Sequence, residues 1–216
     1  METYNANGTP GAYSPAPGPS GKRALKNLAL SYLMAAQLPD AHAMAKEQFE
    51  HATNMTDRMA AFGAIVADGS AEASAAAATR FYEEWQHDQL VVDKWFSALA
   101  SSPRTGVDGI TGLMQHPAFT LRNPNRARSV IFAFCMANPR GFHAPDGSGY
   151  AFWGDQVLAL DAINPEIAAR LARAGDQWAR FIPEVSQRIH TQLERLAKHS
   201  SLSRNTLEIV SKALSL

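Results

Sequence analysis

Residues 116–150 read HPAFTLRNPNRARSVIFAFCMANPRGFHAPDGSGY, and this stretch contains two positions at which a helix is expected to begin. Asn123 and Asn138 are each followed by proline. An Asn side chain can accept a hydrogen bond from the first helical turn, and proline suits the next position because no N–H donor is needed there. Asn164, also followed by proline, repeats the pattern. Three such starts predict an all-helical chain.

Apolar residues recur at helical spacing along most of the chain. The clearest stripes are Leu25, Leu28, Tyr32 and Ala36; Met55, Met59, Phe62 and Val66; Trp153, Val157 and Leu160; and Val185, Ile189, Leu193 and Leu196. This spacing gives about a dozen short helices, each with one apolar face. No segment alternates as a strand does, and β-branched residues are sparse. So many short helices suit an array of stacked helix pairs better than a single bundle.

The N-terminal segment differs in composition from the rest. Residues 5–21, NANGTPGAYSPAPGPSG, are rich in Gly, Pro and Ser and carry no charge, so we expect no regular helix there. We therefore predict a flexible loop or linker over residues 1–21 and a single helical-repeat domain over residues 22–216. A linker so close to residue 1 suggests a fragment of a longer chain.

Charge and hydropathy exclude several classes of partner. Twenty Lys and Arg residues balance twenty Asp and Glu residues, so the chain has no basic field to attract nucleic acid. No apolar run approaches the roughly 20 residues needed to cross a bilayer, and the N-terminus lacks the pattern of a secretory signal. We expect no nucleic-acid or membrane partner and a cytoplasmic location.

Candidate metal ligands and nucleophiles are few. The seven histidines form no pair at the spacing of three or four residues that a helical metal site needs, and no His-Glu-x-x-His occurs. Cys135 is the only cysteine and lies in an apolar run, where a thiol usually fills space. We predict no metal site and no catalytic residue in this chain.

The segment from His143 to Tyr150 contains His, Asp and Ser close together. A Ser-His-Asp arrangement is one interpretation, but such triads are defined by geometry and not by nearness in sequence. The simpler interpretation is a helix start capped by Asp146 or Ser148, with the glycines supplying backbone angles that other residues avoid.

Glu166 and Arg170 lie four residues apart, just after the helix start at Asn164. Such a pair most simply stabilises its own helix by a few tenths of a kcal/mol. The same spacing would also let Arg170 project from a wall of the fold toward a ligand carboxylate. The residues alone leave both interpretations open.

Several motifs together resemble one known family. They are Lys22-Arg23-Ala24-Leu25-Lys26-Asn27, Ala52-Thr53-Asn54-Met55-Thr56-Asp57, Val92-Asp93-Lys94-Trp95-Phe96, Asn123-Pro124-Asn125-Arg126, and Phe142-His143 with Asp146-Gly147-Ser148-Gly149-Tyr150. In order and spacing from about Lys22 to Leu216, they resemble the C-terminal helical domain of bacterial M1-family aminopeptidase N, a family of zinc metallopeptidases.

This resemblance implies a right-handed α-α superhelix of stacked helix pairs, an ARM/HEAT-like solenoid, that closes over the active site and controls peptide access. Zinc would belong to the missing catalytic domain of the same parent chain, which is the expected partner, and peptide substrates would be reached through that parent. The fragment itself would have no cofactor and would not act as an enzyme on its own. Arg170 matches a family position near the substrate cavity, and Glu166 stands where the family often has Gln.

Two other hypotheses remain. One is a free-standing helical-repeat module that binds a protein or peptide on its concave face. The other is a self-sufficient hydrolase that uses Cys135 or Ser148 with His143. A domain cut from its parent should also expose apolar surface, which can lead the fragment to self-associate.

Overall fold

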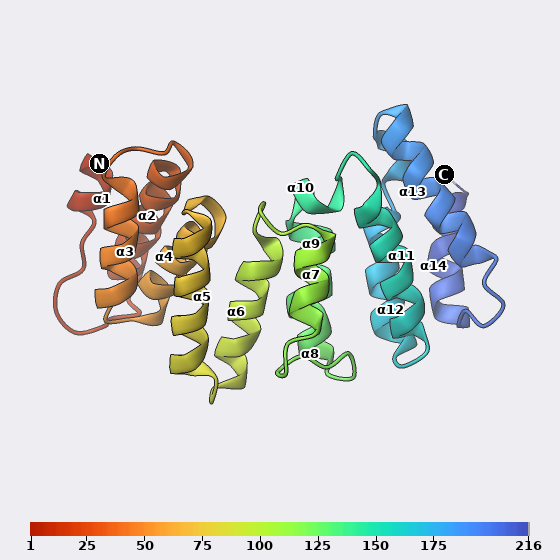
Figure 1. Ribbon diagram of the computed structural model, residues 1–216, viewed down its shortest axis with the longest axis horizontal. Coiled ribbons are helices and arrows are strands. Elements are labelled where there is room, and N and C mark those ends of the chain that lie inside the picture. The colour runs from red at the N-terminus through yellow and green to blue at the C-terminus, as the bar shows by residue number, and fades with distance from the viewer. Residues whose placement is uncertain (216) are drawn as a thin grey trace. The chain divides into compact units, whose positions relative to one another are not determined.

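The computed structural model describes residues 1–215, and the chain divides into two compact units, Met1–Ser102 and a second that begins at Pro103. The single helical-repeat domain expected over residues 22–216 stays a prediction. The division follows the last helix of the first unit, where Ser102 is extended and Pro103 cannot continue a helix. Residues 1–215 contain helices and no strand (Figure 1), so the predicted all-α fold class is confirmed.

The first unit contains six helices. They are α1 (Glu2–Ala6), α2 (Pro17–Ala35), α3 (Ala41–His51), α4 (Met55–Asp68), α5 (Ala71–Trp85) and α6 (Gln89–Ser101). Helix α4 contacts four of the others, α2, α3, α5 and α6. At its centre Phe62 stacks on Phe81 with ring centroids 4.8 Å apart, and Phe49 lies beside both rings. These aromatic side chains hold α3, α4 and α5 together.

The N-terminal segment is more ordered in secondary structure than its composition predicts. Helix α1 covers Glu2–Ala6, and α2 begins at Pro17, so residues 17–21, expected in the linker, are helical. Prolines fit there because the first turn of a helix needs no N–H donors. The Tyr4 hydroxyl donates to Gln48 Oε1 at 2.9 Å and ties α1 to α3. The loop that follows α1 is tied to α2, because Arg23 Nη2 donates to the Ser14 carbonyl at 2.8 Å.

The apolar stripe predicted on α2 does not face the core. Leu25, Leu28 and Tyr32 are 51%, 54% and 70% exposed. The buried face of this helix is formed instead by Arg23, Leu30, Leu33 and Met34. Helix α2 therefore has apolar side chains on two opposite faces, and sequence periodicity identified the wrong one as the core stripe.

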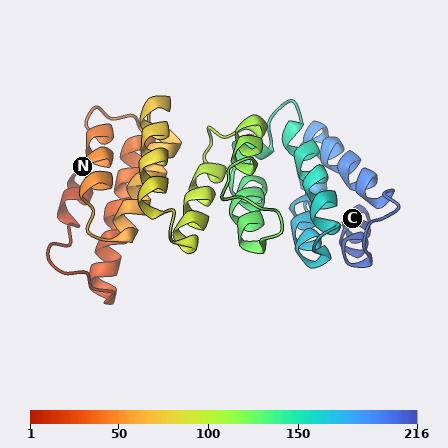
Figure 2. The same ribbon diagram turned by 60° about the horizontal axis from the view of Figure 1, so that its bottom comes forward.

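The second unit consists mainly of short helices and turns, together with the longer helices α11 and α13. They are α7 (Val107–Met114), α8 (Pro124–Ala127), the π-helical turn η1 (Arg128–Phe132), α9 (Ala133–Ala137), α10 (Pro139–Phe142), α11 (Ser148–Asp161), α12 (Pro165–Ala172), the 3₁₀ turns η2 (Arg173–Gly175) and η3 (Trp178–Arg180), α13 (Pro183–Ala197) and α14 (Arg204–Leu214). Helix α11 packs against α12 and α13, and α14 packs against both of those helices (Figure 2). Trp153, Val157 and Leu160 of α11 are buried as predicted.

The three Asn-Pro sequences are helix starts, as predicted. The side-chain oxygen of Asn123 accepts from the Asn125 N–H, that of Asn138 from Gly141, and that of Asn164 from Ile167. In each case proline occupies the first helical position. Local sequence chemistry is sufficient to start these helices.

The turn before α11 also follows the helix-start interpretation, with one difference. Asp146 Oδ1 accepts from the Ser148 N–H at 2.9 Å, and Gly147 has a positive φ of 78°. Gly149 has a different role, because a β-carbon there would collide with the carbonyl oxygen of Phe142. It allows α11 to approach α10 closely. No helix within residues 1–215 combines the length and apolar character needed to span a membrane.

Candidate functional site

The candidate pair Glu166 and Arg170 lies on the surface of α12. The side chain of Asn164 caps the helix, which places Glu166 in its first turn and Arg170 in its last. Arg170 Nη2 lies 3.1 Å from Glu166 Oε1, and the two side chains are 58% and 74% exposed. A solvated pair of this kind contributes about 0.3–0.5 kcal/mol to the helix. The guanidinium remains accessible to a ligand, and its contact with substrate stays a prediction.

A second arginine follows on the same surface. Arg173 Nε lies 3.0 Å from Asp176 Oδ2, and its side chain is 63% exposed. Each arginine here has an acidic neighbour at short range, so a ligand carboxylate would compete with an internal carboxylate at either position. Arg173 is a matched reference for Arg170, because both are exposed and paired.

The segment from His143 to Tyr150 forms a cap and not a catalytic array. The Ser148 hydroxyl donates to Asp146 Oδ1 at 2.7 Å, whereas His143 Nδ1 lies 2.8 Å from the Tyr150 hydroxyl. Hydrogen bonds from Ser148 lower the pKa of Asp146, and burial lowers the pKa of His143. Ser148 is thus bonded to a carboxylate and not to His143, which a serine hydrolase would need as its general base. This geometry favours the structural interpretation.

Cys135 is buried in the second unit, as its apolar setting predicts. Burial raises the pKa of its thiol well above the ordinary value of 9.0. The thiol is therefore protonated at neutral pH, and a protonated, buried thiol is a poor nucleophile.

Metal-binding side chains are not grouped in the part of the chain that the structure describes. Residues 1–215 contain no cluster of three or more His, Cys, Asp or Glu side chains able to hold an ion. His51 lies 3.8 Å from Glu47, and His190 lies 3.8 Å from Glu194. These are two-residue helix contacts of the kind expected from the i,i+4 spacing.

A polar network that was not predicted from the sequence joins α2, α3 and α4. Asp57 is 4% exposed and accepts from Asn27 Nδ2 at 2.9 Å and from Asn54 Nδ2 at 3.2 Å. Lys26 Nζ lies 3.4 Å from the same carboxylate. Gln48 donates to the carbonyl of Asp57 and to Asn27 Oδ1, at 2.8 Å each. The motifs at residues 22–27 and 52–57 thus meet in space.

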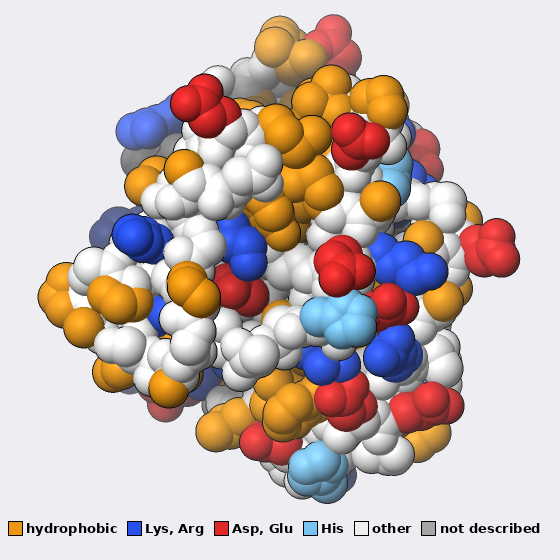
Figure 3. Space-filling view, turned by 90° about the vertical axis from the view of Figure 1, so that its left-hand side faces the viewer, with side chains coloured by type: hydrophobic (Ala, Val, Ile, Leu, Met, Phe, Trp, Pro, Cys, Tyr) orange, Lys and Arg blue, Asp and Glu red, His pale blue; other side chains and the backbone are white. Residues whose placement is uncertain are grey.

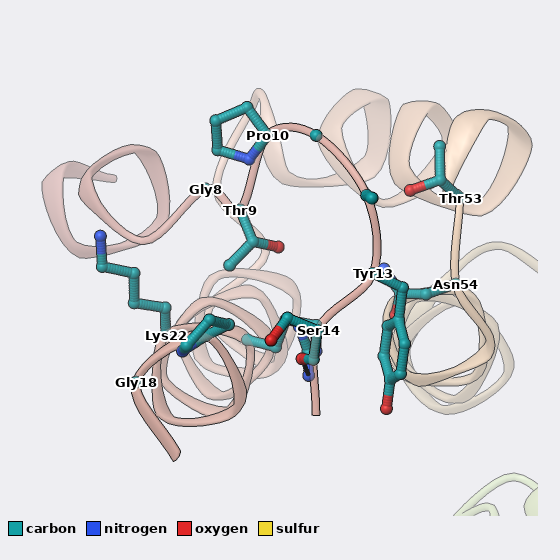
Figure 4. Close-up of a pocket in the computed structure, with 13 residues that line it drawn as sticks. Gly8, Thr9, Pro10, Tyr13, Ser14, Gly18, Lys22, Thr53 and Asn54 are labelled. Atoms are coloured by element: carbon teal, nitrogen blue, oxygen red, sulfur yellow. Dashed lines mark hydrogen bonds between the residues drawn. The ribbon is translucent and has the colours of Figure 1, made fainter. Parts of the chain in front are cut away.

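A cavity of about 300 Å³ lies beside this network. It is lined by the loop over residues 8–14, by the first turns of α2 and by Thr53 and Asn54 before α4 (Figure 4). Its charged lining residues are Lys22 and Arg23, but Arg23 already donates to Ser14 and Ser20. The lining consists mainly of turn residues, and the donors of its arginine are already bonded within the chain. The cavity therefore fits a loop fixed against α2 better than a binding site.

A second hollow, of about 470 Å³, lies between α3 and α5. Phe49 and Ile65 contribute apolar surface, while Lys46 and Glu72 are among its charged lining residues. Arg80 Nη1 lies 3.3 Å from Glu50 Oε1, so an ion pair joins the two helices within this lining. A groove with an apolar base and charged rims can accept a peptide segment.

Comparison with known proteins assigns the family. A family model described as "Domain of unknown function (DUF3458_C) ARM repeats" matches residues 1–215. The chain belongs to this family. The ARM-repeat description agrees with the stacked short helices of both units and with the predicted solenoid class.

Curated relatives of this DUF3458_C chain are named Aminopeptidase N. The protein from Caulobacter vibrioides is 38% identical over 205 residues, which cover 94% of this chain and 24% of the relative. The Escherichia coli protein is 38% identical over 194 residues, which cover 89% and 22%. The chain therefore spans about a quarter of the length of the relatives it matches.

A solved structure is also similar to this DUF3458_C chain. It is described as Legionella pneumophila aminopeptidase A in complex with aspartic acid, and it matches with a TM-score of 0.87 and 26% identity. The match covers 99% of this chain and 26% of the other chain. The predicted resemblance to the C-terminal helical domain of aminopeptidase N is confirmed.

Proposed function

We propose that this chain is the noncatalytic C-terminal domain of a zinc-dependent M1 aminopeptidase, which removes N-terminal residues from peptides. In this proposal the domain bounds the cavity that leads to the active site and limits which peptides reach it. The observation that carries the proposal is the match to relatives named Aminopeptidase N. The match covers 89–94% of this chain and about a quarter of the length of each relative.

The side chains of this domain do not fit a zinc site. Residues 1–215 offer no three-residue group of metal ligands, and Cys135 is buried and protonated. Zinc, when bound elsewhere in the parent protein, would supply the activated water for peptide hydrolysis. The contribution of this chain would be to orient the peptide and to exclude water and bulky substrates from the cavity.

Arg170 is the residue proposed to contact peptide. Its guanidinium is more than half exposed and is held at one side by Glu166, so it can turn toward a ligand carboxylate by exchanging one acidic partner for another. Glu166 would set the resting orientation of the guanidinium. This role belongs to the substrate cavity of the parent protein and does not require zinc in this chain.

A free-standing peptide-binding module is the second candidate, and the groove between α3 and α5 is the observation that favours it. That groove has an apolar base and lies within one unit, so it needs no other polypeptide to form. If this candidate were right, peptide binding would depend on groove residues such as Lys46 and Glu72. Substitution of Arg170 would then leave binding unchanged.

The experiment that tests the proposal compares peptides of increasing length as substrates of the longer polypeptide that contains this sequence. We expect zinc-dependent release of N-terminal residues from short peptides and little release from folded proteins. Equal rates on folded and unfolded substrates would contradict the role in access. A cytoplasmic location is part of the same proposal and is tested by cell fractionation with an antibody to this domain.

A further inference from the structure

The outward face of α2 is a continuous apolar surface. Leu25, Leu28 and Tyr32 follow one another at helical spacing, and all are more than half exposed. Ala36 continues the same line and is also exposed. The end of the first unit that carries α1 and α2 is shown in Figure 3, where hydrophobic side chains gather in the upper middle of the face.

Two of the three charged side chains of α2, Arg23 and Lys26, lie away from this surface, and the exposed Lys22 lies one turn before Leu25. Within α2, Arg23 and Lys26 are the charged residues that follow Lys22. Arg23 is buried and bonded to Ser14, while Lys26 is paired with Asp57 and lies over the ring of Tyr4. At 100° per residue both lie on the side of the helix that faces α1 and α4, away from Leu25, Leu28 and Tyr32. From Leu25 to Ala36 the exposed stripe therefore has no charge within it.

This surface differs from the outer face of the last helix. The exposed residues of α14 include Arg204, Glu208 and Lys212, which make its outer face polar. A polar outer face of this kind is typical of the capping helices of repeat arrays. Helix α2 has the composition of an internal repeat, with apolar side chains on both sides.

We infer that a further apolar helix packs on Leu25, Leu28 and Tyr32, and that it is contributed by the parent polypeptide outside the present 216 residues. This inference rests on the proposed function, since the chain spans about a quarter of its relatives and the remaining length can supply such a helix. The absence of charge among Leu25, Leu28 and Tyr32 fits a helix of the same array and disfavours a charged peptide. The array then continues beyond α2.

Thiol labelling tests this contact directly. Cys135 is the only cysteine of the chain and is buried, so Leu28→Cys places one accessible thiol on the proposed interface. Ser211→Cys is the control, because Ser211 is exposed on the polar face of α14, away from the proposed interface. In the 216-residue chain both thiols should react at similar rates. In the longer polypeptide the Leu28→Cys thiol should react at least about tenfold more slowly, while the Ser211→Cys rate is unchanged.

Each other outcome contradicts the inference. Equal labelling of Leu28→Cys in the short and long polypeptides would show that no helix covers this face. Protection that appears in the 216-residue chain as its concentration rises would assign the face to a second copy instead. Leu28→Glu and Ser211→Glu give an independent measurement, since only the former should lower the melting temperature of the longer polypeptide. Aminopeptidase activity of the unsubstituted longer polypeptide is measured separately, so failure of the proposed function is distinguished from failure of this contact.

Discussion

Asn27 donates to the carboxylate of Asp57 at 2.9 Å, across 30 residues of sequence, and joins α2 to α4. Asp57 is nearly buried, and its second oxygen is shared by Lys26 and Asn54. Because Gln48 of α3 bonds to both Asn27 and the Asp57 backbone, one carboxylate organises three helices. This network supports the helix that presents the proposed interface.

Replacement of the buried carboxylate should destabilise the first unit. In Asp57→Ala, the amide of Asn27 and the ammonium of Lys26 lose their common acceptor while still partly buried. We expect the free energy of unfolding to fall by about 2–3 kcal/mol. Urea denaturation followed by circular dichroism measures this change. Asp40→Ala is the control, since Asp40 is exposed and makes no capping bond, and an equal loss in both variants would refute the role of the network.

Gly149 should be intolerant of even one added methyl group. A β-carbon at this position would meet the carbonyl oxygen of Phe142, which is backbone and cannot rotate away. Gly149→Ala is therefore expected to lower the free energy of unfolding by about 2–3 kcal/mol. Gly112→Ala provides the comparison, because nothing lies within 4 Å of a β-carbon there and helix α7 should become about 0.5–1 kcal/mol more stable. Opposite signs in thermal unfolding are the expected result.

Acidification should destabilise the second unit through His143. Burial lowers the pKa of this histidine below its ordinary value of 6.5, so the unfolded chain takes up a proton at a higher pH than the folded chain. The contribution of neutral His143 to the free energy of unfolding is therefore fully present above pH 6.5. It is lost as the pH falls from 6.5 through the lower pKa that His143 has in the folded chain. The free energy of unfolding should decrease over this range.

His116 also has a lowered pKa, so the two contributions must be separated by substitution. In His143→Phe the decrease between pH 7 and the acid range should be smaller than in the unsubstituted chain, and the His116 contribution should remain. NMR titration of His143 gives the direct value. Titration at or above 6.5 would show that the ring is not held neutral by burial.

Loss of Arg170 should weaken peptide binding by the longer polypeptide. Arg170→Ala removes an exposed guanidinium, and we expect binding to weaken by about 1–3 kcal/mol, seen as a higher KM with zinc content unchanged. Arg173→Ala is the matched control, because Arg173 is similarly exposed and paired. An unchanged KM across a series of peptides, or an equal change in both variants, would reject the specific role.

Elements that depend on neighbouring residues were predictable from the sequence. Asn123, Asn138 and Asn164 each cap a helix through a bond made within three residues, and such chemistry does not depend on the rest of the fold. The helix start predicted near Asp146 and Ser148 was correct, since α11 begins at Ser148, but its N-cap is Gly147, which has no side chain to make a cap bond.

Features that depend on distant residues were not predictable. Periodicity shows that Leu25, Leu28 and Tyr32 share a face of α2, but it cannot tell which of two apolar faces is buried. The bond between Asn27 and Asp57 spans two motifs whose meeting is set by the packing of α2 against α4. The resemblance identified those motifs, and the structure explains why they occur together.

The most direct test of the central proposal is release of amino acids from aminoacyl reporter substrates, measured with added zinc for the 216-residue chain and for the longer polypeptide. We predict no turnover by the 216-residue chain and zinc-dependent turnover by the longer polypeptide. Steady turnover by the highly purified 216-residue chain, abolished by Cys135→Ala or Ser148→Ala, would contradict the account.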